Sequence, residues 1–167
     1  TRIGFFSVLE NMGADIEWNN MRKEGGEWVG DVHIFCQQLN GLHIMKDLIP
    51  TVIDEIPIIA VIATQADSPT VIEGAAELRV KESDRIKAIC QNLQSMGAEI
   101  IEKQDGFIIN PITKLHHTNI ETFDDHRIAM AFTIAGLLPS EKNTLDDEHC
   151  INISFPEFSD ILRQICQ

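Results

Sequence analysis

The chain has 167 residues, 44% of them hydrophobic and 23% charged, which is typical of a folded domain with a core and excludes a disordered chain. Its formal net charge of −13 at pH 7 disfavours binding to nucleic acid or to an anionic membrane surface, since both need a positive contact surface. No apolar run reaches the roughly 18 residues of a membrane span, and the first residues lack the pattern of a signal peptide, so we expect a soluble, cytoplasmic protein.

The first elements in chain order are a helix, a turn and a strand. Residues 3–12 place apolar side chains at helical spacing, Gly13 follows as a C-cap, and residues 14–19 alternate as in a strand. The glycines of residues 23–26 predict a hairpin turn. Further short strands are predicted in segments 26–35, 41–45, 69–74, 105–111 and 119–123.

Several more helices are predicted along the chain. The segment from Ile53 to Thr64 is almost wholly apolar and should be buried on most sides. A charged helix is expected to begin near Lys81, another apolar helix follows residues 124–127, and a last helix begins near Phe155. Buried apolar helices of this kind fit an arrangement with helices inside and sheets outside.

The order of these elements repeats. Residues 85–103 follow the pattern of residues 2–20, and residues 54–60 precede an apolar helix much as residues 125–131 do. Self-similarity over tens of residues predicts stacked α/β units, none of which buries its apolar face alone. The sequence therefore predicts an internal duplication in a mixed α/β domain.

No linker or low-complexity segment divides the chain, and we assign residues 1–167 to one domain. Because the chain begins with Thr1, directly in a helical pattern, we expect a fragment whose upstream part is absent. Four widely spaced cysteines without a C-x-x-C pair predict reduced, mostly buried thiols. His116 and His117 lack partners at ligand spacing, so we predict no metal site.

Charged residues gather in residues 79–85. Lys81 and Arg85 stand four positions apart and would share a helical face, with Glu82 close by, if a helix begins there. The free N–H groups of a helix start add positive potential, which suits an anionic ligand. A solvated, salt-bridged first turn is the competing interpretation, and for this cluster alone it is favoured.

Two other charged clusters stand at predicted helix starts. Asp125, His126 and Arg127 precede a wholly apolar helix, where Asp125 is either a site residue or an N-cap paired with Arg127. Asp54 stands ahead of Pro57, and acidic first turns are common for dipole reasons alone, so a structural role is favoured there. Because the three clusters occupy corresponding points of the repeat, they can converge and form an anion-binding site.

Segments 49–63, 74–86, 124–137 and 151–158 resemble, in order, the C-terminal half of the 5-enolpyruvylshikimate-3-phosphate synthases. The resemblance covers essentially the whole chain. It implies an enolpyruvyl transferase-like inside-out α/β domain of repeated βαβαββ units, with about two of three units present. It also implies transfer of the enolpyruvyl group of phosphoenolpyruvate to the 5-hydroxyl of shikimate 3-phosphate, without metal or cofactor. Such an enzyme is expected to be monomeric when full length. Its N-terminal domain would be missing here.

The resemblance further implies catalytic roles for three residues. Asp54 would hydrogen-bond the ring hydroxyls of shikimate 3-phosphate, including the attacking 5-hydroxyl. Lys81 would be its basic neighbour at that hydroxyl, and Glu82 would protonate the methylene carbon of phosphoenolpyruvate. Such proton transfers need groups of these types beside the reacting atoms.

Substrate-binding roles are implied for Arg85 and Arg127, which would clamp the phosphoenolpyruvate carboxylate, and for His126, which would support Glu82 and the arginines. Planar bidentate arginines suit that task because both substrates are anionic. The chain departs from some members at Ile153, where they place a phosphate-binding lysine. Glu77, where some members have Asn, receives no role.

Two other interpretations stay open. The chain could belong to a different enolpyruvyl transferase, such as the UDP-N-acetylglucosamine enzyme, or it could be a nonenzymatic anion-binding module, for which charged helix starts suffice. Since the family's site is shared between two domains, we expect this chain to fold but to be inactive alone.

Overall fold

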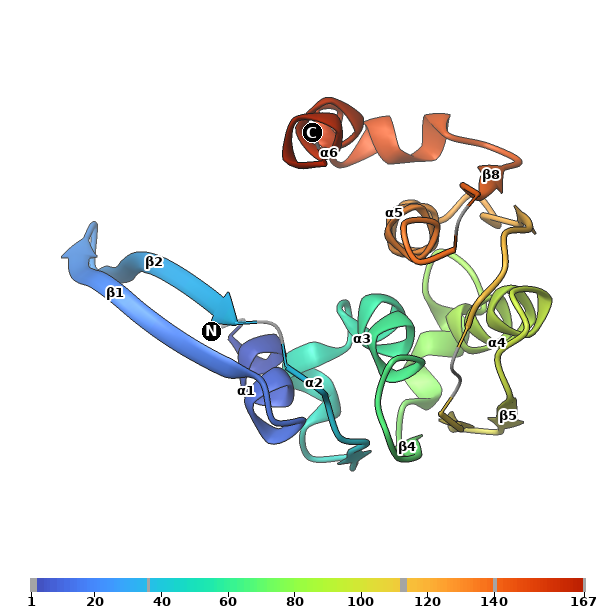
Figure 1. The fold of residues 1–167 in the computed structure, drawn as a ribbon, viewed down its shortest axis with the longest axis horizontal. Coiled ribbons are helices and arrows are strands. Elements are labelled where there is room, and N and C mark those ends of the chain that lie inside the picture. Colours follow the sequence, from blue (N-terminus) through green and yellow to red (C-terminus); the bar gives the residue numbers. More distant parts are fainter. Residues whose placement is uncertain (1–2, 36, 112–113, 140, 167) are drawn as a thin grey trace.

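Two copies of one α/β unit make up most of the chain, and their elements come in the same order (Figure 1). The computed structural model describes residues 3–35, 37–111, 114–139 and 141–166. The helices are α1 (Gly4–Asn11), α2 (Ile49–Val52), α3 (Ile56–Ala63), α4 (Arg85–Ser95), α5 (His126–Ala135) and α6 (Phe158–Ile165), with 3-10 helices η1 (Ala76–Val80) and η2 (His149–Ile153). The strands are β1 (Asp15–Glu24), β2 (Glu27–Phe35), β3 (His43–Ile44), β4 (Thr70–Ile72), β5 (Ile100–Lys103), β6 (Gly106–Ile109), β7 (Asn119–Ile120) and β8 (Thr144–Leu145).

The first helix of each unit ends in the same way. After α1, Gly13 has φ +94°, and after α4, Gly97 has φ +91°, a left-handed conformation that suits glycine. The N–H of Ala14 then donates to the carbonyl of Leu9, and the N–H of Ala98 donates to that of Leu93, both at 2.9 Å. The predicted C-cap at Gly13 and the predicted duplication are therefore confirmed.

Each unit closes with two parallel strands joined through a helix. Strand β3 pairs in parallel with β4, and β7 pairs in parallel with β8. The N–H of Glu73 donates to the carbonyl of Ile44, as the N–H of Asp146 does to that of Ile120, both at 3.1 Å. Helices α2 and α3 lie between the strands in the first unit, and α5 lies between them in the second.

The sheets join one unit to the next. Strand β4 of the first unit pairs antiparallel with β6 of the second, which gives the four-stranded order β3-β4-β6-β5. Hairpin β1–β2 forms a sheet of its own and turns at Gly25 and Gly26, both at positive φ as the prediction of a hairpin requires. Figure 1 shows this hairpin projecting from the rest of the chain.

The core lies among the helices of the two units. Helix α3 buries six of its eight residues, with Ile56, Ile59 and Ala60 wholly buried, and it packs against α4 and α5. It begins at Ile56 rather than at Ile53, because a short separate helix, α2, and a turn precede it. The expected buried apolar helix is therefore confirmed, with a later start.

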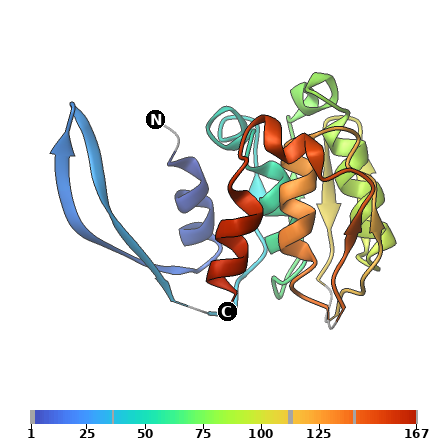
Figure 2. The same ribbon diagram turned by 90° about the horizontal axis from the view of Figure 1, so that it is seen from above.

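Helix α6 repeats the position of α4 along the chain. Helix α4 begins 13 positions after β4 ends, from Ile72 to Arg85, and α6 begins 13 positions after β8 ends, from Leu145 to Phe158. A 3-10 helix of five residues stands between strand and helix in both cases. Helix α6 lies beside α5 (Figure 2), yet none of its residues is buried. None of the helices in the described ranges is long and apolar enough to cross a membrane.

Candidate functional site

Helix α5 begins with a tightly fixed turn. Phe123 and Asp124 both have left-handed backbones, with φ of 55° and 56°, which is uncommon for residues other than glycine. The next residue, Asp125, is the N-cap: its carboxylate accepts from the backbone N–H of Arg127 at 2.9 Å and of Ile128 at 3.4 Å. The N-cap role considered from the sequence is confirmed.

The ion-pair partner of Asp125 is Arg85. Arg85 Nε donates to Asp125 Oδ2 at 2.7 Å and Arg85 Nη2 donates to Oδ1 at 3.3 Å, a bidentate arrangement. The side chains are 1% and 0% exposed. Ser83 Oγ donates a further hydrogen bond of 3.0 Å to Asp125. The pairing of Asp125 with the Arg127 side chain, considered from the sequence, is wrong, because Arg85 on α4 occupies the carboxylate.

The buried pair keeps Asp125 ionised. Burial disfavours the charged form and acts to raise its pKa, but the hydrogen bonds and charge of Arg85, with the N–H of Arg127, outweigh burial and hold the pKa below its usual range. A buried charge is tolerated only when it is paired and hydrogen-bonded in this way. The Arg85–Asp125 pair is therefore a fixed link between α4 and α5.

Arg85 also brings the other two charged clusters together. Its Nη2 donates to Glu82 Oε2 at 2.6 Å, and its Nη1 lies 3.5 Å from Asp54 Oδ1. Asp54 stands just before α3, Glu82 just before α4 and Asp125 just before α5. One guanidinium thus contacts carboxylates from three helix starts. The prediction that the three clusters converge is confirmed.

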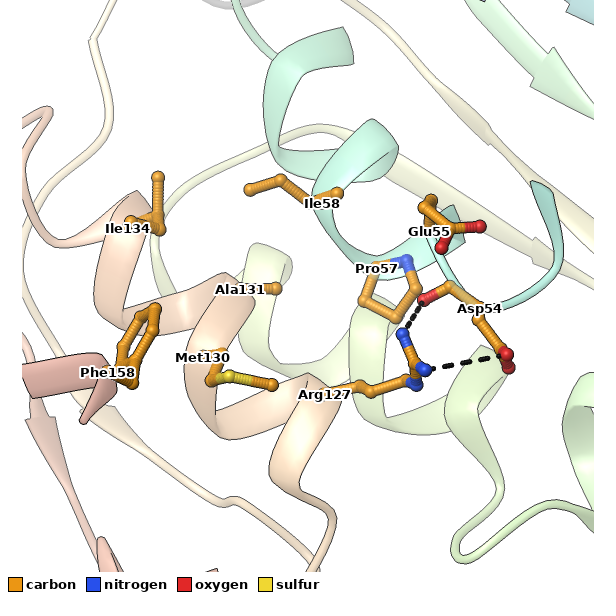
Figure 3. Close-up of a pocket in the computed structure, with 9 residues that line it drawn as sticks. All are labelled: Asp54, Glu55, Pro57, Ile58, Arg127, Met130, Ala131, Ile134 and Phe158. Carbon is orange, nitrogen blue, oxygen red and sulfur yellow. Dashed lines mark hydrogen bonds and ion pairs between the residues drawn. The ribbon is translucent and has the colours of Figure 1, made fainter. Parts of the chain in front are cut away.

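A second guanidinium, that of Arg127, lies across Asp54. Arg127 Nη1 donates to the backbone carbonyl of Asp54 at 3.1 Å, and Nη2 lies 3.4 Å from its Oδ2 (Figure 3). Arg127 is 29% exposed, whereas Arg85 is almost wholly buried. Of these two arginines, Arg127 is the one that presents donors to a ligand without prior rearrangement.

A pocket opens beside Asp54 and Arg127, between α3 and α5 (Figure 3). Apart from Asp54, Glu55 and Arg127, its walls are apolar: Pro57, Ile58, Met130, Ala131, Ile134 and Phe158. The charged groups lie at one end and the apolar side chains at the other, with Phe158 of α6 at the far side. Low-dielectric walls strengthen the field of the charged groups at their end of the pocket.

Lys81 lies elsewhere than the spacing predicted. Helix α4 begins at Arg85, capped by Asp84, whose Oδ1 accepts from the N–H of Lys87 at 3.0 Å. Lys81 ends η1 instead, with an extended backbone, and its Nζ lies 2.5 Å from Glu77 Oε1. The predicted helical face shared by Lys81 and Arg85 is therefore wrong, since the helix has not begun at Lys81.

His126 occupies the first position of α5, partly exposed and next to Arg127. Its ring makes no hydrogen bond or ion pair with the part of the chain that the structure describes. His116 and His117 lie apart from the arginine cluster, and His117 pairs with Glu141. No group of three or more histidine, cysteine or acidic side chains suited to a metal occurs in the described ranges.

None of the three described cysteines makes a hydrogen bond or ion pair with the arginine cluster. Cys90 and Cys150 are buried, and Cys166 is exposed. Burial raises the pKa of Cys90 to about 12, which makes its thiol unreactive. Cys36 lies outside the described residues.

Sequence reasoning missed two residues of this region. Ser83, which binds Asp125, was passed over as part of a charged run, although a serine two positions before a helix is a common hydrogen-bonding residue. Arg79 binds Asp84 and Glu102, and no local pattern predicts its second partner, since the two residues are 23 positions apart. The N-cap at Asp84 could have been predicted from the apolar periodicity that follows it.

The fold defines the class of protein. EPSP synthase from Acinetobacter baumannii superposes on the chain with a TM-score of 0.92 at 39% identity, over 98% of this chain and 38% of that one. The enolpyruvyl transferase NikO from Streptomyces tendae superposes with a TM-score of 0.71 over 98% of this chain and 35% of that one; at 16% identity it supports the fold alone. The expected inside-out α/β fold of the enolpyruvyl transferases is therefore confirmed.

Sequence comparison defines the family within that class. Residues 1–162 match the family described as EPSP synthase (3-phosphoshikimate 1-carboxyvinyltransferase), and the chain belongs to this family. It is 48% identical over 166 residues to a 3-phosphoshikimate 1-carboxyvinyltransferase of Thermodesulfovibrio yellowstonii and 47% identical over 165 residues to one of Sulfurihydrogenibium. Each alignment covers 99% of this chain but only 39% or 38% of the relative, so the chain spans about two fifths of their length.

Proposed function

We propose that the protein carrying this chain is a 3-phosphoshikimate 1-carboxyvinyltransferase, which joins phosphoenolpyruvate to the 5-hydroxyl of shikimate 3-phosphate and releases phosphate. The observation that carries the proposal is the meeting of Asp54, Glu82, Arg85 and Arg127 in one cluster within a chain of this family. Two guanidinium groups beside two partly exposed carboxylates supply what an anionic substrate and two proton transfers need.

Arg127 and Arg85 bind the phosphoenolpyruvate carboxylate in this proposal. Arg127 offers a partly exposed planar fork at the charged end of the pocket. Arg85 is held by Asp125 through Nε, so its orientation is set before substrate arrives. Its Nη2 contact with Glu82 involves a carboxylate that is 51% exposed, and this is the contact that a substrate carboxylate can replace.

Glu82 and Asp54 move the protons. The 5-hydroxyl oxygen bonds to C2 of phosphoenolpyruvate and its proton passes to Asp54, while C3 takes a proton from Glu82. The bond from C2 to the phosphate oxygen then breaks as C3 returns a proton to Glu82, and the double bond of the enol ether forms. Phosphate leaves with the proton held by Asp54, which restores both carboxyl groups. Lys81 neighbours the hydroxyl and lowers its cost of ionisation, and His126 supports Glu82 and the arginines.

In the proposed enzyme, residues 1–167 belong to the C-terminal domain of a longer, cytoplasmic, monomeric protein. An N-terminal domain supplies the remaining substrate contacts, and no metal or cofactor takes part. The chain's coverage of only 38% to 39% of its relatives supports the proposal that the protein is longer than this chain. Measurable phosphate release from the two substrates by the isolated 167-residue chain would contradict the need for the N-terminal domain.

The test uses the full-length protein with two substitutions of different character. Glu82→Gln is expected to lower kcat by about 10²-fold or more with little change in KM, because it removes a proton donor. Arg127→Ala is expected to weaken phosphoenolpyruvate binding by about 2 to 5 kcal/mol, because it removes a charge that is paired in the ground state. Arg163→Ala, at an exposed arginine of α6, serves as the matched control and is expected to change neither.

Phosphate release is measured with shikimate 3-phosphate or UDP-N-acetylglucosamine as acceptor, and binding is measured by calorimetry. Turnover with UDP-N-acetylglucosamine alone would assign the protein to another enolpyruvyl transferase. Absence of turnover with either acceptor, together with binding of simple anions, would favour an anion-binding module. An unchanged kcat in Glu82→Gln, or unchanged phosphoenolpyruvate affinity in Arg127→Ala, would refute the assigned roles.

A further inference from the structure

Arg79 joins two separate segments of the chain through its guanidinium. Nη1 donates to both carboxylate oxygens of Asp84 at 3.1 and 2.9 Å, and Nη2 donates to Glu102 Oε1 at 2.9 Å. Nε and Nη2 also donate to the backbone carbonyls of Gln104 at 2.7 Å and Lys103 at 2.5 Å. With every nitrogen of the fork engaged by protein acceptors, Arg79 has no donor to spare for a ligand.

These contacts fasten the loop between η1 and α4 to hairpin β5–β6. Arg79 stands in η1 before the loop, and Asp84 stands after it as the N-cap of α4. Glu102 belongs to β5, which is part of the four-stranded sheet and therefore a rigid support. The loop between them carries Lys81, the proposed neighbour of the attacking hydroxyl, and Glu82, the proposed proton donor.

The other restraints on that loop are three side-chain contacts, of Lys81, Glu82 and Ser83. Val80 is 79% exposed, and Glu82 is half exposed. Lys81 is held by Glu77, which is itself largely exposed, and an exposed ion pair of this kind is weak. On the buried side, Ser83 donates a hydrogen bond to Asp125, and Glu82 accepts one from Arg85 Nη2 at 2.6 Å. The bridge made by Arg79 is therefore the main restraint on the outer side of the loop.

We propose that Arg79 is a positioning residue of the reaction, which sets the place of Lys81 and Glu82 by holding Asp84 to Glu102 without touching substrate. The inference rests on the proposed function, since it assigns Arg79 to the same site. A displacement of a catalytic group by about 1 Å can cost about 10²-fold in rate. The planar fork is essential to the bridge, because a lysine ammonium at this position reaches one side or the other.

Three variants of the full-length enzyme test the proposal. Arg79→Gln is expected to lower kcat by about 10²-fold and Arg79→Lys by about tenfold, with KM for phosphoenolpyruvate changed less than about threefold, since Arg85 and Arg127 stay in place. Glu102→Gln removes one side of the bridge and is expected to resemble Arg79→Lys. Arg163→Gln, which removes an exposed arginine of α6, is the matched control.

The pH profile of kcat separates positioning from a merely structural role. A misplaced Glu82 donates and accepts its proton in a changed environment, so the apparent pKa values of the profile are expected to shift in Arg79→Gln and Arg79→Lys. Ethylguanidine is expected to restore part of the kcat of Arg79→Gln at temperatures well below its unfolding midpoint. If Arg79→Gln does not fold, Arg79→Lys and Glu102→Gln give the same comparison.

The outcomes distinguish this inference from the proposed function. A parent enzyme without enolpyruvyl transfer would refute the proposed function. An active parent with unchanged kcat in the Arg79 variants would refute only the role of Arg79. Equal losses in kcat and in affinity with an unchanged pH profile would show that Arg79 merely stabilises the fold, and would also overturn the inference.

Discussion

Helices α4 and α6 hold corresponding places in the repeat, yet their surroundings differ. Both begin 13 positions after a parallel strand, and both follow a 3-10 helix of five residues. Helix α4 buries Ile86, Ile89 and Leu93 completely and is capped by the side chain of Asp84. Helix α6 buries none of its residues, and its N-cap, Glu157, makes no side-chain hydrogen bond to the helix.

The difference shows what an amphipathic sequence does and does not decide. Helix α6 carries apolar residues at i, i+3, i+4 and i+7, from Phe158 to Ile165, which is the stripe of a helix that packs on a core. Helix α4 buries its stripe because α3, α5, η1 and hairpin β5–β6 surround it. A helix sequence therefore defines an apolar face, and neighbouring elements decide whether that face is buried.

The first residues of α4 and α6 also play different parts in the candidate site and its pocket. At the first position of α4, Arg85 is buried and binds three carboxylates, whereas at the first position of α6, Phe158 lines the apolar end of the pocket. The repeat thus supplies a charged group from one copy and an apolar group from the other. Four predictions, on the 167-residue chain unless stated, test how far the two helices differ.

The largest difference in unfolding free energy is expected when the ion pairs of the two helices are broken. Asp125→Ala leaves Arg85 buried without its main partner and is expected to lower the free energy of unfolding by about 3 to 5 kcal/mol. Asp160→Ala breaks the exposed pair with Arg163 on α6 and is expected to cost about 1 kcal/mol or less. Urea denaturation of both variants measures the contrast, and equal costs would contradict it.

The second largest difference in unfolding free energy is expected for apolar residues at matching positions of the two helices. Ile89→Ala, on the buried face of α4, should cost about 2 to 4 kcal/mol, because it leaves a cavity in a packed core. Leu162→Ala, at the matching position of α6, should cost about 1 kcal/mol or less. In the full-length protein the cost of Leu162→Ala is expected to rise, since the proposed enzyme has further segments to cover α6. A cost that is equally small in both proteins would contradict that expectation.

The two N-caps give a smaller contrast. Asp84→Ala is expected to cost about 1 to 2 kcal/mol, because the N–H of Lys87 loses its acceptor and Arg79 loses a partner. Glu157→Ala is expected to leave the free energy of unfolding almost unchanged, because Glu157 makes no capping hydrogen bond. Thermal unfolding followed by circular dichroism compares the two, and a cost for Glu157→Ala as large as that for Asp84→Ala would remove the distinction.

The smallest effect is expected in the pH dependence of the free energy of unfolding. The pKa of Asp125 is lowered in the folded chain, so its stabilising contribution is fully present above the unfolded value of about 3.9 and is lost as pH falls towards the folded value. The free-energy difference between the parent and Asp125→Asn is therefore expected to be constant above about pH 5 and to shrink below about pH 4. A constant difference for Asp125→Asn down to acid unfolding would contradict the prediction.

Much of the fold was accessible from the sequence because it depends on local chemistry. Gly13 and Gly97 predict the same helix end twice, since both need a left-handed backbone, and the apolar run before Thr64 predicts a buried helix. The position of the charged clusters at corresponding points of the repeat predicted their convergence, which the contacts of Arg85 confirm. The catalytic roles remain proposals.

The identity of the partners within the cluster was decided only by tertiary structure. The sequence left open a pairing of Asp125 with Arg127 and suggested a shared helical face for Lys81 and Arg85, and the structure shows neither. Nothing local pairs Arg79 with Glu102 either. Periodicity and capping act over a few residues, so the sequence by itself determined the repeat, the apolar faces and the charged helix starts. An ion pair between residues 23 or 40 positions apart depends on which helices and hairpins pack together, and the burial that strengthens it depends on the same packing.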